Sequence, residues 1–191
     1  MQLQVVVRFG GDIMALQKLD KPIKGYDISY CQPKVNWDKV QADFIIIKAG
    51  EGRYPKGKDK YFESHYENAK KRGIPVGCYW YSHATTVDIA RQEAEAFATV
   101  IKGKQFEMPV FLDIEAKETT ILNKTQFSNI IAAFLEEMEK RGYWVGLYHS
   151  LCDSLARVSE SIRTRYCYWL AWWLGPNGNP RTKYKLPIGL W

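Results

Sequence analysis

The sequence is poor in the residues that build metal centres and disulfide frameworks. It contains only three histidines in 191 residues, and none of its four cysteines forms a Cys-x-x-Cys pair. Because zinc sites draw on closely spaced Cys and His, we expect no metal site and no cofactor. A chain of this length also buries enough apolar surface to fold without disulfides. Cys78 and Cys167 lie in apolar runs and are expected in the core.

The sequence also lacks a transmembrane run and a recognisable secretory signal. It has no stretch of about twenty apolar residues, so we expect no membrane-spanning segment. Near the start, Val5-Val6-Val7 is too short an apolar region for a signal peptide. We therefore expect residues 1–23 to be a leader or extension and residues 24–191 to form one domain.

The net charge of +6 is spread over short clusters, and no long basic run occurs. A solvated basic surface is the commonest explanation of such a balance. An anionic polymer such as a bacterial wall also fits, and we do not predict nucleic-acid binding. Aromatic residues make up 14% of the chain, which suits either sugar platforms or a large core.

Strand-like and helix-like segments alternate about every 30 residues. Apolar runs predict strands, whereas stripes at three- and four-residue steps predict helices. The run at 44–49 has no polar alternation, as in a strand buried on both faces. His65 is expected on a helix surface, and Thr125 and Gly142 are expected to cap the start and end of one helix. The predicted strands are 25–29, 44–49, 74–81, 108–115, 144–148, 166–173 and 186–191, and the predicted helices are 59–72, 87–101, 125–142 and 151–162.

This alternation predicts an α/β fold with a parallel sheet and crossover helices. An open doubly wound sheet and a barrel both fit the pattern. A (β/α) barrel normally has about eight strands, so for a barrel we expect the last C-terminal strand to be lacking.

One strand ends in two carboxylates. Residues two apart on a strand project from the same face, so Asp113 and Glu115 should point together near the end of the strand 108–115. Such a pair suits the acid and the stabiliser of glycoside hydrolysis, although on the spacing alone an acidic turn after a buried strand is the commoner explanation.

The other strand ends favour the first explanation. In parallel α/β folds the functional site lies at the carboxyl ends of the strands. We therefore expect acidic and aromatic side chains to gather on one rim. The residues at these ends are Asp27 and Ser29, 48–51, 79–83, Asp113 and Glu115, Tyr148 and His149, and Trp172 and Trp173.

A loop at 52–59 nearly matches the phosphate-binding pattern G-x-x-x-x-G-K-[ST]. Asp59 stands at the last position, which loses the hydroxyl for magnesium and adds a negative charge beside phosphate. Pro55 removes a backbone donor. A basic surface loop explains these residues better than a nucleotide site.

With these residues assembled, the chain resembles glycoside hydrolase family 25, the Chalaropsis-type lysozymes found among phage endolysins and bacterial autolysins. The resemblance runs from about Lys24 to Trp191. The matching segments, in family-like order and spacing, are Asp27-Ile28-Ser29 with Gln32, 44–52, Gly77-Cys78-Tyr79, 112–115, Gly146-Leu147-Tyr148 and Trp169-Leu170-Ala171.

The resemblance implies an irregular TIM-like (β/α) barrel and cleavage of the β-1,4 bond between N-acetylmuramic acid and N-acetylglucosamine in peptidoglycan. It implies that Glu115 is the general acid and that Asp113 stays ionised to stabilise the transition state or a cyclised N-acetyl group. Asp27 would position substrate or water. Direct-nucleophile and substrate-assisted routes both stay open. Glu51, Tyr79, Tyr148 and Trp173 would line the sugar groove, although barrel packing explains the aromatic residues equally well.

The chain departs from the family pattern at Gly50, Trp80 and Tyr81, and it stops where the family continues with a further acidic strand. A cell-wall glycan-binding module without catalysis is therefore the alternative. For a phage enzyme we expect synthesis in the host cytoplasm and action on the wall, and otherwise secretion to the wall. The sequence does not predict an oligomeric state.

Overall fold

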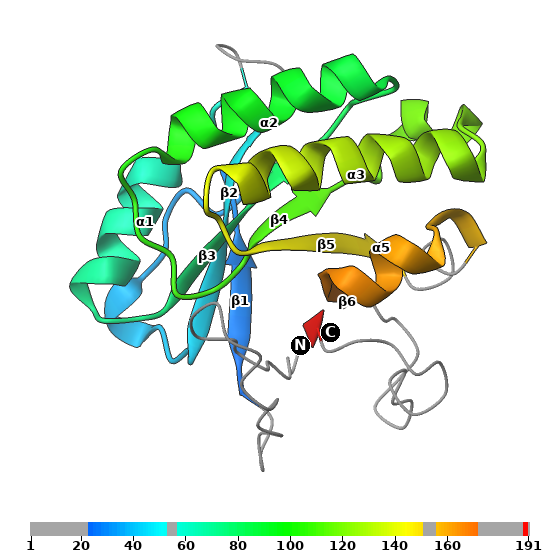
Figure 1. The fold of residues 1–191 in the computed structure, drawn as a ribbon. Helices are drawn as coiled ribbons and strands as arrows, with labels where there is room; N and C mark the ends of the chain where they lie inside the picture. Colours follow the sequence, from blue (N-terminus) through cyan, green and yellow to red (C-terminus); the bar gives the residue numbers. More distant parts are fainter. Residues whose placement is uncertain (1–22, 53–56, 151–155, 172–188, 191) are drawn as a thin grey trace.

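A computed structural model of the chain describes residues 23–52, 57–150, 156–171 and 189–190 (Figure 1). The predicted leader, apart from Ile23, lies outside these residues, as do Cys152, Trp172 and Trp173.

The fold is built on one parallel sheet whose seven strands lie side by side in sequence order. Every neighbouring pair is parallel, which confirms the predicted α/β class with crossover connections. The strands are β1 Gly25–Ile28, β2 Phe44–Glu51, β3 Val76–Tyr81, β4 Val110–Asp113, β5 Val145–Ser150, β6 Cys167–Ala171 and the two-residue β7 Gly189–Leu190.

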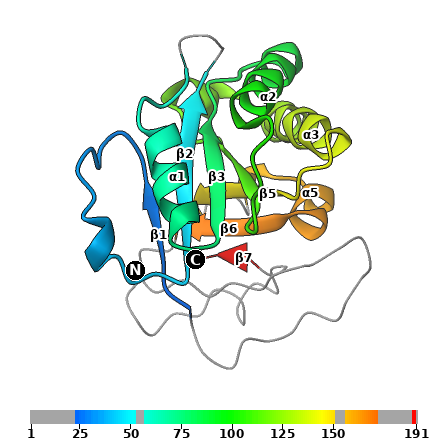
Figure 2. The same ribbon diagram turned by 90° about the vertical axis from the view of Figure 1, so that its left-hand side faces the viewer.

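The three long helices lie together on one face of this sheet (Figures 1 and 2). They are α1 Phe62–Lys71, α2 Val87–Ile101 and α3 Lys124–Lys140, and a shorter helix, α5 Glu160–Arg165, precedes β6. Two 3₁₀ helices, η1 Trp37–Lys39 and η2 Lys117–Ile121, follow β1 and β4. None of the helices in the described segments is long and apolar enough to cross a bilayer.

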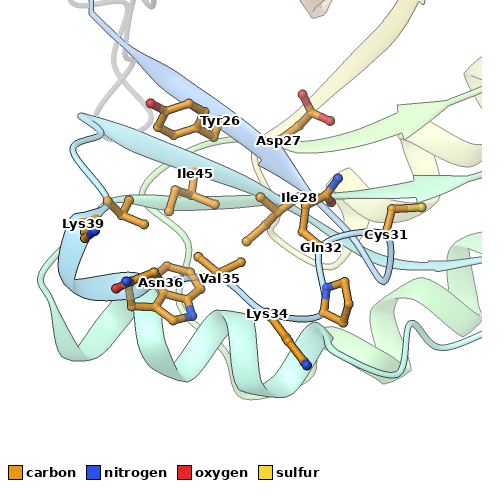
Figure 3. Close-up of a pocket in the computed structure, with 13 residues that line it drawn as sticks. Tyr26, Asp27, Ile28, Cys31, Gln32, Lys34, Val35, Asn36, Lys39 and Ile45 are labelled. Carbon is orange, nitrogen blue, oxygen red and sulfur yellow. The ribbon is translucent and has the colours of Figure 1, made fainter.

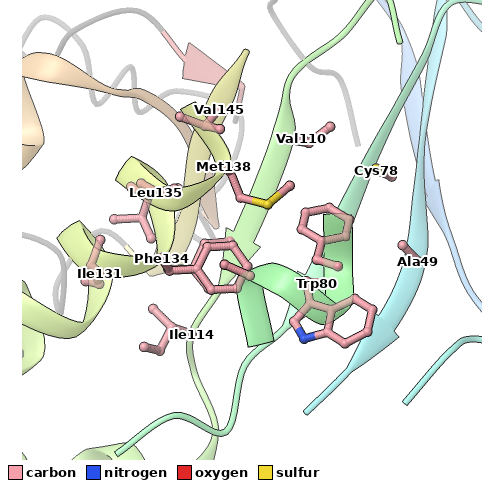
Figure 4. Close-up of a cluster of buried hydrophobic side chains, with 14 of the residues drawn as sticks. Ala49, Cys78, Trp80, Val110, Ile114, Ile131, Phe134, Leu135, Met138 and Val145 are labelled. Atoms are coloured by element: carbon pink, nitrogen blue, oxygen red, sulfur yellow. The ribbon is translucent and has the colours of Figure 1, made fainter. Parts of the chain in front are cut away.

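The main core lies between the sheet and these helices. Figure 4 shows Phe134 and Met138 of α3 beside Trp80 of β3 and Val110 of β4. Ile45 and Ile47 of β2 belong to this core, whereas Phe44 and Ile46 belong to a second cluster on the other face. β2 is therefore buried on both faces, as its continuous apolar run predicts.

The second cluster shows that the sheet is curled. Phe44 and Ile46 from β2, Met108 and Phe111 at β4 and Trp169 from β6 are all buried in it, although β2 and β6 are separated by three strands. Side chains of such distant strands meet only if the sheet bends around them. The result is a concave inner face filled by aromatic and aliphatic groups.

Several local predictions need correction. Asn123, and not Thr125, caps α3: its side chain accepts the Gln126 backbone N–H at 2.9 Å, and Gln126 completes a capping box. The predicted helix over 151–162 is interrupted at residues 158–159, and α5 then continues beyond the predicted end to Arg165. Gly142 ends α3 with φ 83°, as predicted.

His65 is not a surface residue. It is 2% exposed, and its Nε2 lies 3.4 Å from the carbonyl oxygen of Ser29, so it joins α1 to the segment after β1. Cys78 is buried, as expected, whereas Cys167 is only half-buried.

Candidate active site

An acidic pocket opens at the carboxyl end of the sheet, above the inner-face cluster. Its volume is about 240 Å³. The pocket collects side chains from β1, β3, β5 and β6 and from the end of β4, and they are Asp27, Tyr79, Asp113, Glu115, Tyr148, Trp169 and Ala171. Asp113 and Glu115 therefore share one cavity with Asp27, which lies far from them in the sequence.

Strand alternation explains why these residues meet. Phe111 lies in the inner-face cluster, and Asp113 follows it two residues later on the same face. In the same way Tyr79 and Tyr148 follow Gly77 and Gly146. A Cβ atom at Gly146 would lie 2.6 Å from Phe111 Cε1, so the glycine leaves the space in which the pocket floor packs.

Asp113 is the most deeply buried of the three acids, at 6% exposure. Its neighbours in the sheet register are Tyr81 on β3 and Tyr148 on β5. Its backbone oxygen accepts the Ser82 N–H at 2.7 Å, but its side-chain Oδ1 is buried without a hydrogen-bond partner in the described part of the chain. A buried unpaired oxygen is costly, and a donor brought by a ligand would satisfy it.

Burial raises the pKa of all three carboxyl groups. The pKa of Asp113 is raised well above its usual value, first by burial and then by the charges of Glu115 and Asp27, whereas Lys48 lowers it. Burial raises the pKa of Glu115, and it raises that of Asp27 against a backbone hydrogen bond that lowers it. The pocket therefore favours the protonated forms of its acids more than open solvent does.

The two tyrosines of the pocket stay neutral hydrogen-bonding groups. Burial, and then the nearby carboxylates, raise the pKa of Tyr79 and Tyr148 above the usual range of tyrosine. Tyr81, which is the register partner of Asp113, has its pKa raised to about 12 for the same reasons.

The structure brings most of the predicted site residues together in this pocket. Asp27, Asp113, Glu115, Tyr79 and Tyr148 line the pocket. Glu51 stands at the end of β2, ion-paired with Lys48, and is not among the lining residues. Trp173 lies outside the described residues.

Trp169 lines the pocket but was not predicted as a site residue. It lies in the predicted strand 166–173, within the motif Trp169-Leu170-Ala171 that the chain shares with the family. The alternation of side chains along a strand could have predicted it, because Trp169 precedes Ala171 by two residues and so lies on the same face.

A second cavity of about 580 Å³ lies between β1 and residues 31–40 (Figure 3). Its lining is mostly apolar, and Asp27 borders both cavities. Nowhere in residues 23–52, 57–150, 156–171 or 189–190 do three or more His, Cys, Asp or Glu side chains gather as a metal site would require.

The fold and the pocket define a parallel α/β protein whose acidic site lies at the carboxyl ends of the strands. The family model of glycosyl hydrolases family 25 matches residues 26–191, which is most of the sequence. The chain therefore belongs to glycosyl hydrolases family 25.

Individual relatives agree with this assignment. The chain is 28% identical over 130 residues to an autolytic lysozyme of Clostridium acetobutylicum, covering 66% of this chain and 38% of that protein. A family 25 lysozyme from Aspergillus fumigatus has a similar structure, with a TM-score of 0.70 and 26% identity over 82% of this chain and 80% of that one.

A third relative shares the fold and was solved with a ligand. It is the autolysin LytC of Streptococcus pneumoniae in complex with a synthetic peptidoglycan ligand, at a TM-score of 0.71 and 22% identity, covering 82% of this chain and 39% of that one. The chain thus spans less than two fifths of the length of the autolytic lysozyme and of LytC.

Proposed function

We propose that the chain is a muramidase that hydrolyses the β-1,4 bond between N-acetylmuramic acid and N-acetylglucosamine in cell-wall peptidoglycan. The observation that carries the proposal is the gathering of Asp27, Asp113 and Glu115 in one pocket with two neutral tyrosines. Family membership and the peptidoglycan ligand of LytC support the choice of substrate.

Glu115 acts as the general acid. It lines the pocket but keeps contact with solvent, and burial raises its pKa. A raised pKa keeps the carboxyl protonated at a higher pH, so that it can protonate the leaving glycosidic oxygen. Once the bond breaks, the carboxylate of Glu115 takes a proton back from the incoming water.

Asp113 carries the negative charge that stabilises the oxocarbenium-like state. Its unpaired Oδ1 accepts the N–H of the substrate N-acetyl group, which orients that group for a substrate-assisted step. A direct attack by a carboxylate is the other route that this arrangement serves. Asp27, from β1, positions substrate or water.

The sugar groove extends from the pocket along the rim. Tyr79 and Tyr148 offer ring edges and neutral hydroxyl groups to a sugar. Glu51 and Trp173 keep the sugar-binding role that the family resemblance implies for them, although Glu51 does not line the pocket and Trp173 lies outside the described residues. A curled parallel sheet with the pocket at the carboxyl ends of its strands supports an irregular TIM-like barrel as the plan of the fold. The cell wall is the place of action.

The test is the release of new reducing ends from purified peptidoglycan. We expect release by the intact chain and a loss of at least about a hundredfold in Glu115→Gln, the usual effect of removing a general acid. Glu136→Gln, on the exposed side of α3, is the matched control and should act as wild type. Circular dichroism checks that each variant keeps its fold.

Two results would count against the proposal. Glu115→Gln could release reducing ends at the wild-type rate. Alternatively, the intact chain could sediment with purified walls and release none, which would identify a glycan-binding module without catalysis.

A further inference from the structure

A single lysine interrupts the apolar run of β2. Lys48 follows Phe44, Ile45, Ile46 and Ile47 in the strand and is only 8% exposed. Burying an ammonium group costs several kcal/mol unless other groups replace its water. The surroundings of Lys48 must therefore compensate its charge.

Three groups do so. The ammonium of Lys48 pairs with the carboxylate of Glu51, and it lies 5.4 Å from the ring centre of Tyr30 and 5.2 Å from that of Tyr81. Tyr30 is itself held in place, because its backbone N–H donates to Asp59 Oδ2 at 2.8 Å. Asp59, which stood in the phosphate-loop pattern, thus anchors the segment that covers Lys48.

The strand geometry aims this lysine at the acidic pocket. Ile46 lies in the inner-face cluster, so Lys48, two residues later, belongs to the same face. Its register partner on β3 is Tyr79, which lines the pocket, and Tyr81 on the same strand is the register partner of Asp113. Lys48 and Asp113 therefore lie on the same face of the sheet, on the two strands that flank β3.

Apart from Lys48, the described titratable groups around Asp113 are acidic residues and tyrosines. Asp27 reaches it from β1, Tyr79 and Tyr81 from β3, Glu115 from its own segment and Tyr148 from β5. From β2 come Glu51 and Lys48, and Lys48 is the one described cation that bears on the pKa of Asp113.

We propose that Lys48 is a positioning residue for the reaction, whose buried ammonium favours the ionised form of Asp113 over its protonated form and so favours the proton of the acidic pair on Glu115. The roles of the two acids rest on the proposed function, whereas the electrostatic coupling of Lys48 to Asp113 does not. Lys48 touches neither the substrate nor the reacting atoms in this scheme and acts through Asp113.

The first test measures that coupling without any substrate. The carboxyl carbon of Asp113 is titrated by ¹³C NMR in wild type and in Lys48→Met, which has a side chain of similar length and no charge. We expect the titration midpoint of Asp113 to rise by about one pH unit in Lys48→Met. In Glu51→Gln the titration midpoint of Asp113 should fall instead, because the ammonium of Lys48 is no longer paired with the carboxylate of Glu51.

Lys104 provides a matched control. Its Nζ lies 2.8 Å from Glu63 Oε2 and over the rings of Phe62 and Tyr66, so it also has a carboxylate and two aromatic neighbours. It is not among the groups that shift the pKa of Asp113. Lys104→Met should leave the midpoint of Asp113 unchanged.

The second test uses activity. In Lys48→Met, the acid limb of kcat/KM should move up by about one pH unit, because ionised Asp113 is required. The basic limb should stay in place, and kcat should fall more than KM rises. Lys48→Arg, which retains the charge, should recover part of the loss and titrate nearly as wild type.

An unchanged Asp113 midpoint in Lys48→Met, or an equal shift in Lys104→Met, would overturn the inference. If Lys48→Met does not fold, Glu51→Gln decides through the direction of its shift, because Glu51 is nearly half exposed and its loss leaves the core intact. A wild-type chain that releases no reducing ends would remove the muramidase proposal, and the NMR result would still stand.

Discussion

Trp169 and Tyr148 meet edge to face, with ring centres 4.6 Å apart, on neighbouring strands of the acidic pocket. The same indole lies 5.9 Å from Tyr79 and 5.6 Å from Phe111, centre to centre. One tryptophan therefore braces two pocket tyrosines on different strands and joins them to the pocket floor. The positions of the tyrosine hydroxyl groups depend on its packing.

Replacing Trp169 should loosen the pocket and destabilise the fold together. Because Trp169 is 5% exposed and contacts three rings, we expect Trp169→Ala to lower the free energy of unfolding by about 3 kcal/mol or more. Trp169→Phe retains part of the packing and should cost about 1 kcal/mol. Urea unfolding gives both values.

The same pair of variants tests the bracing of the tyrosines. In Trp169→Phe, which is expected to stay folded, KM for soluble wall fragments should rise several-fold. A KM equal to that of wild type would show that Tyr79 and Tyr148 are held by other contacts.

Asp113 should make the fold less stable as the pH rises. Its pKa in the folded chain is raised above the usual 3.8. Between these two values the unfolded chain has released its proton while the folded chain still holds it, so stability present at low pH is lost as the pH increases. Asn does not ionise, so the stability of Asp113→Asn relative to wild type should increase as the pH rises.

Thermal unfolding from pH 3 to pH 8 checks this expectation. Asp38→Asn removes an exposed carboxylate instead and should not flatten the pH dependence. If Asp113→Asn and wild type show parallel stability curves, the buried carboxyl does not carry the predicted cost. Activity should fall in Asp113→Asn even as its stability relative to wild type rises with pH.

Gly146 should not tolerate a side chain. An added Cβ would lie 2.6 Å from both Cys167 Sγ and Phe111 Cε1, so Gly146→Ala must displace the pocket floor. We expect a loss of about 1–3 kcal/mol, as for other overpacked sites. Gly103→Ala meets no atom within 4 Å but has φ 77°, so it tests backbone strain alone and should cost about 1 kcal/mol. Equal losses in the two variants would argue against the steric explanation.

The acidic pocket could be predicted because it depends on residue spacing within one segment and on the common edge at which parallel strands end. Asp113 ends β4 and Glu115 follows it by two residues, both line the pocket, and parallel topology brings Asp27 to the same edge. These two arguments need no knowledge of how the strands align. The burial of β2 on both faces is likewise written in its continuous apolar run.

The parts that were missed depend on contacts between distant segments. The burial of His65 requires the segment after β1 to fold back on α1, where Trp37 and Tyr61 meet its ring. Glu51 turns to Lys48 because Tyr30 and Tyr81 close over that lysine. Asn123 and Thr125 are both good capping residues, and only the structure decides between them.

The basic limb of the activity profile should report on Glu115. A general acid must be protonated, so activity falls as the pH rises through its pKa. Burial raises the pKa of Glu115 above the usual 4.5, which moves this fall to a higher pH than an exposed glutamate would give. The measurement is kcat/KM against pH with soluble wall fragments. Glu118 provides a comparison in the same segment. Its pKa is lowered by hydrogen bonds from its own backbone and from His83. Glu118→Gln should therefore leave the basic limb unchanged. A basic limb that moves in Glu118→Gln would assign the titrating proton to another group. A limb at the usual pKa of glutamate would mean that the pocket does not desolvate Glu115 enough for the proposed role.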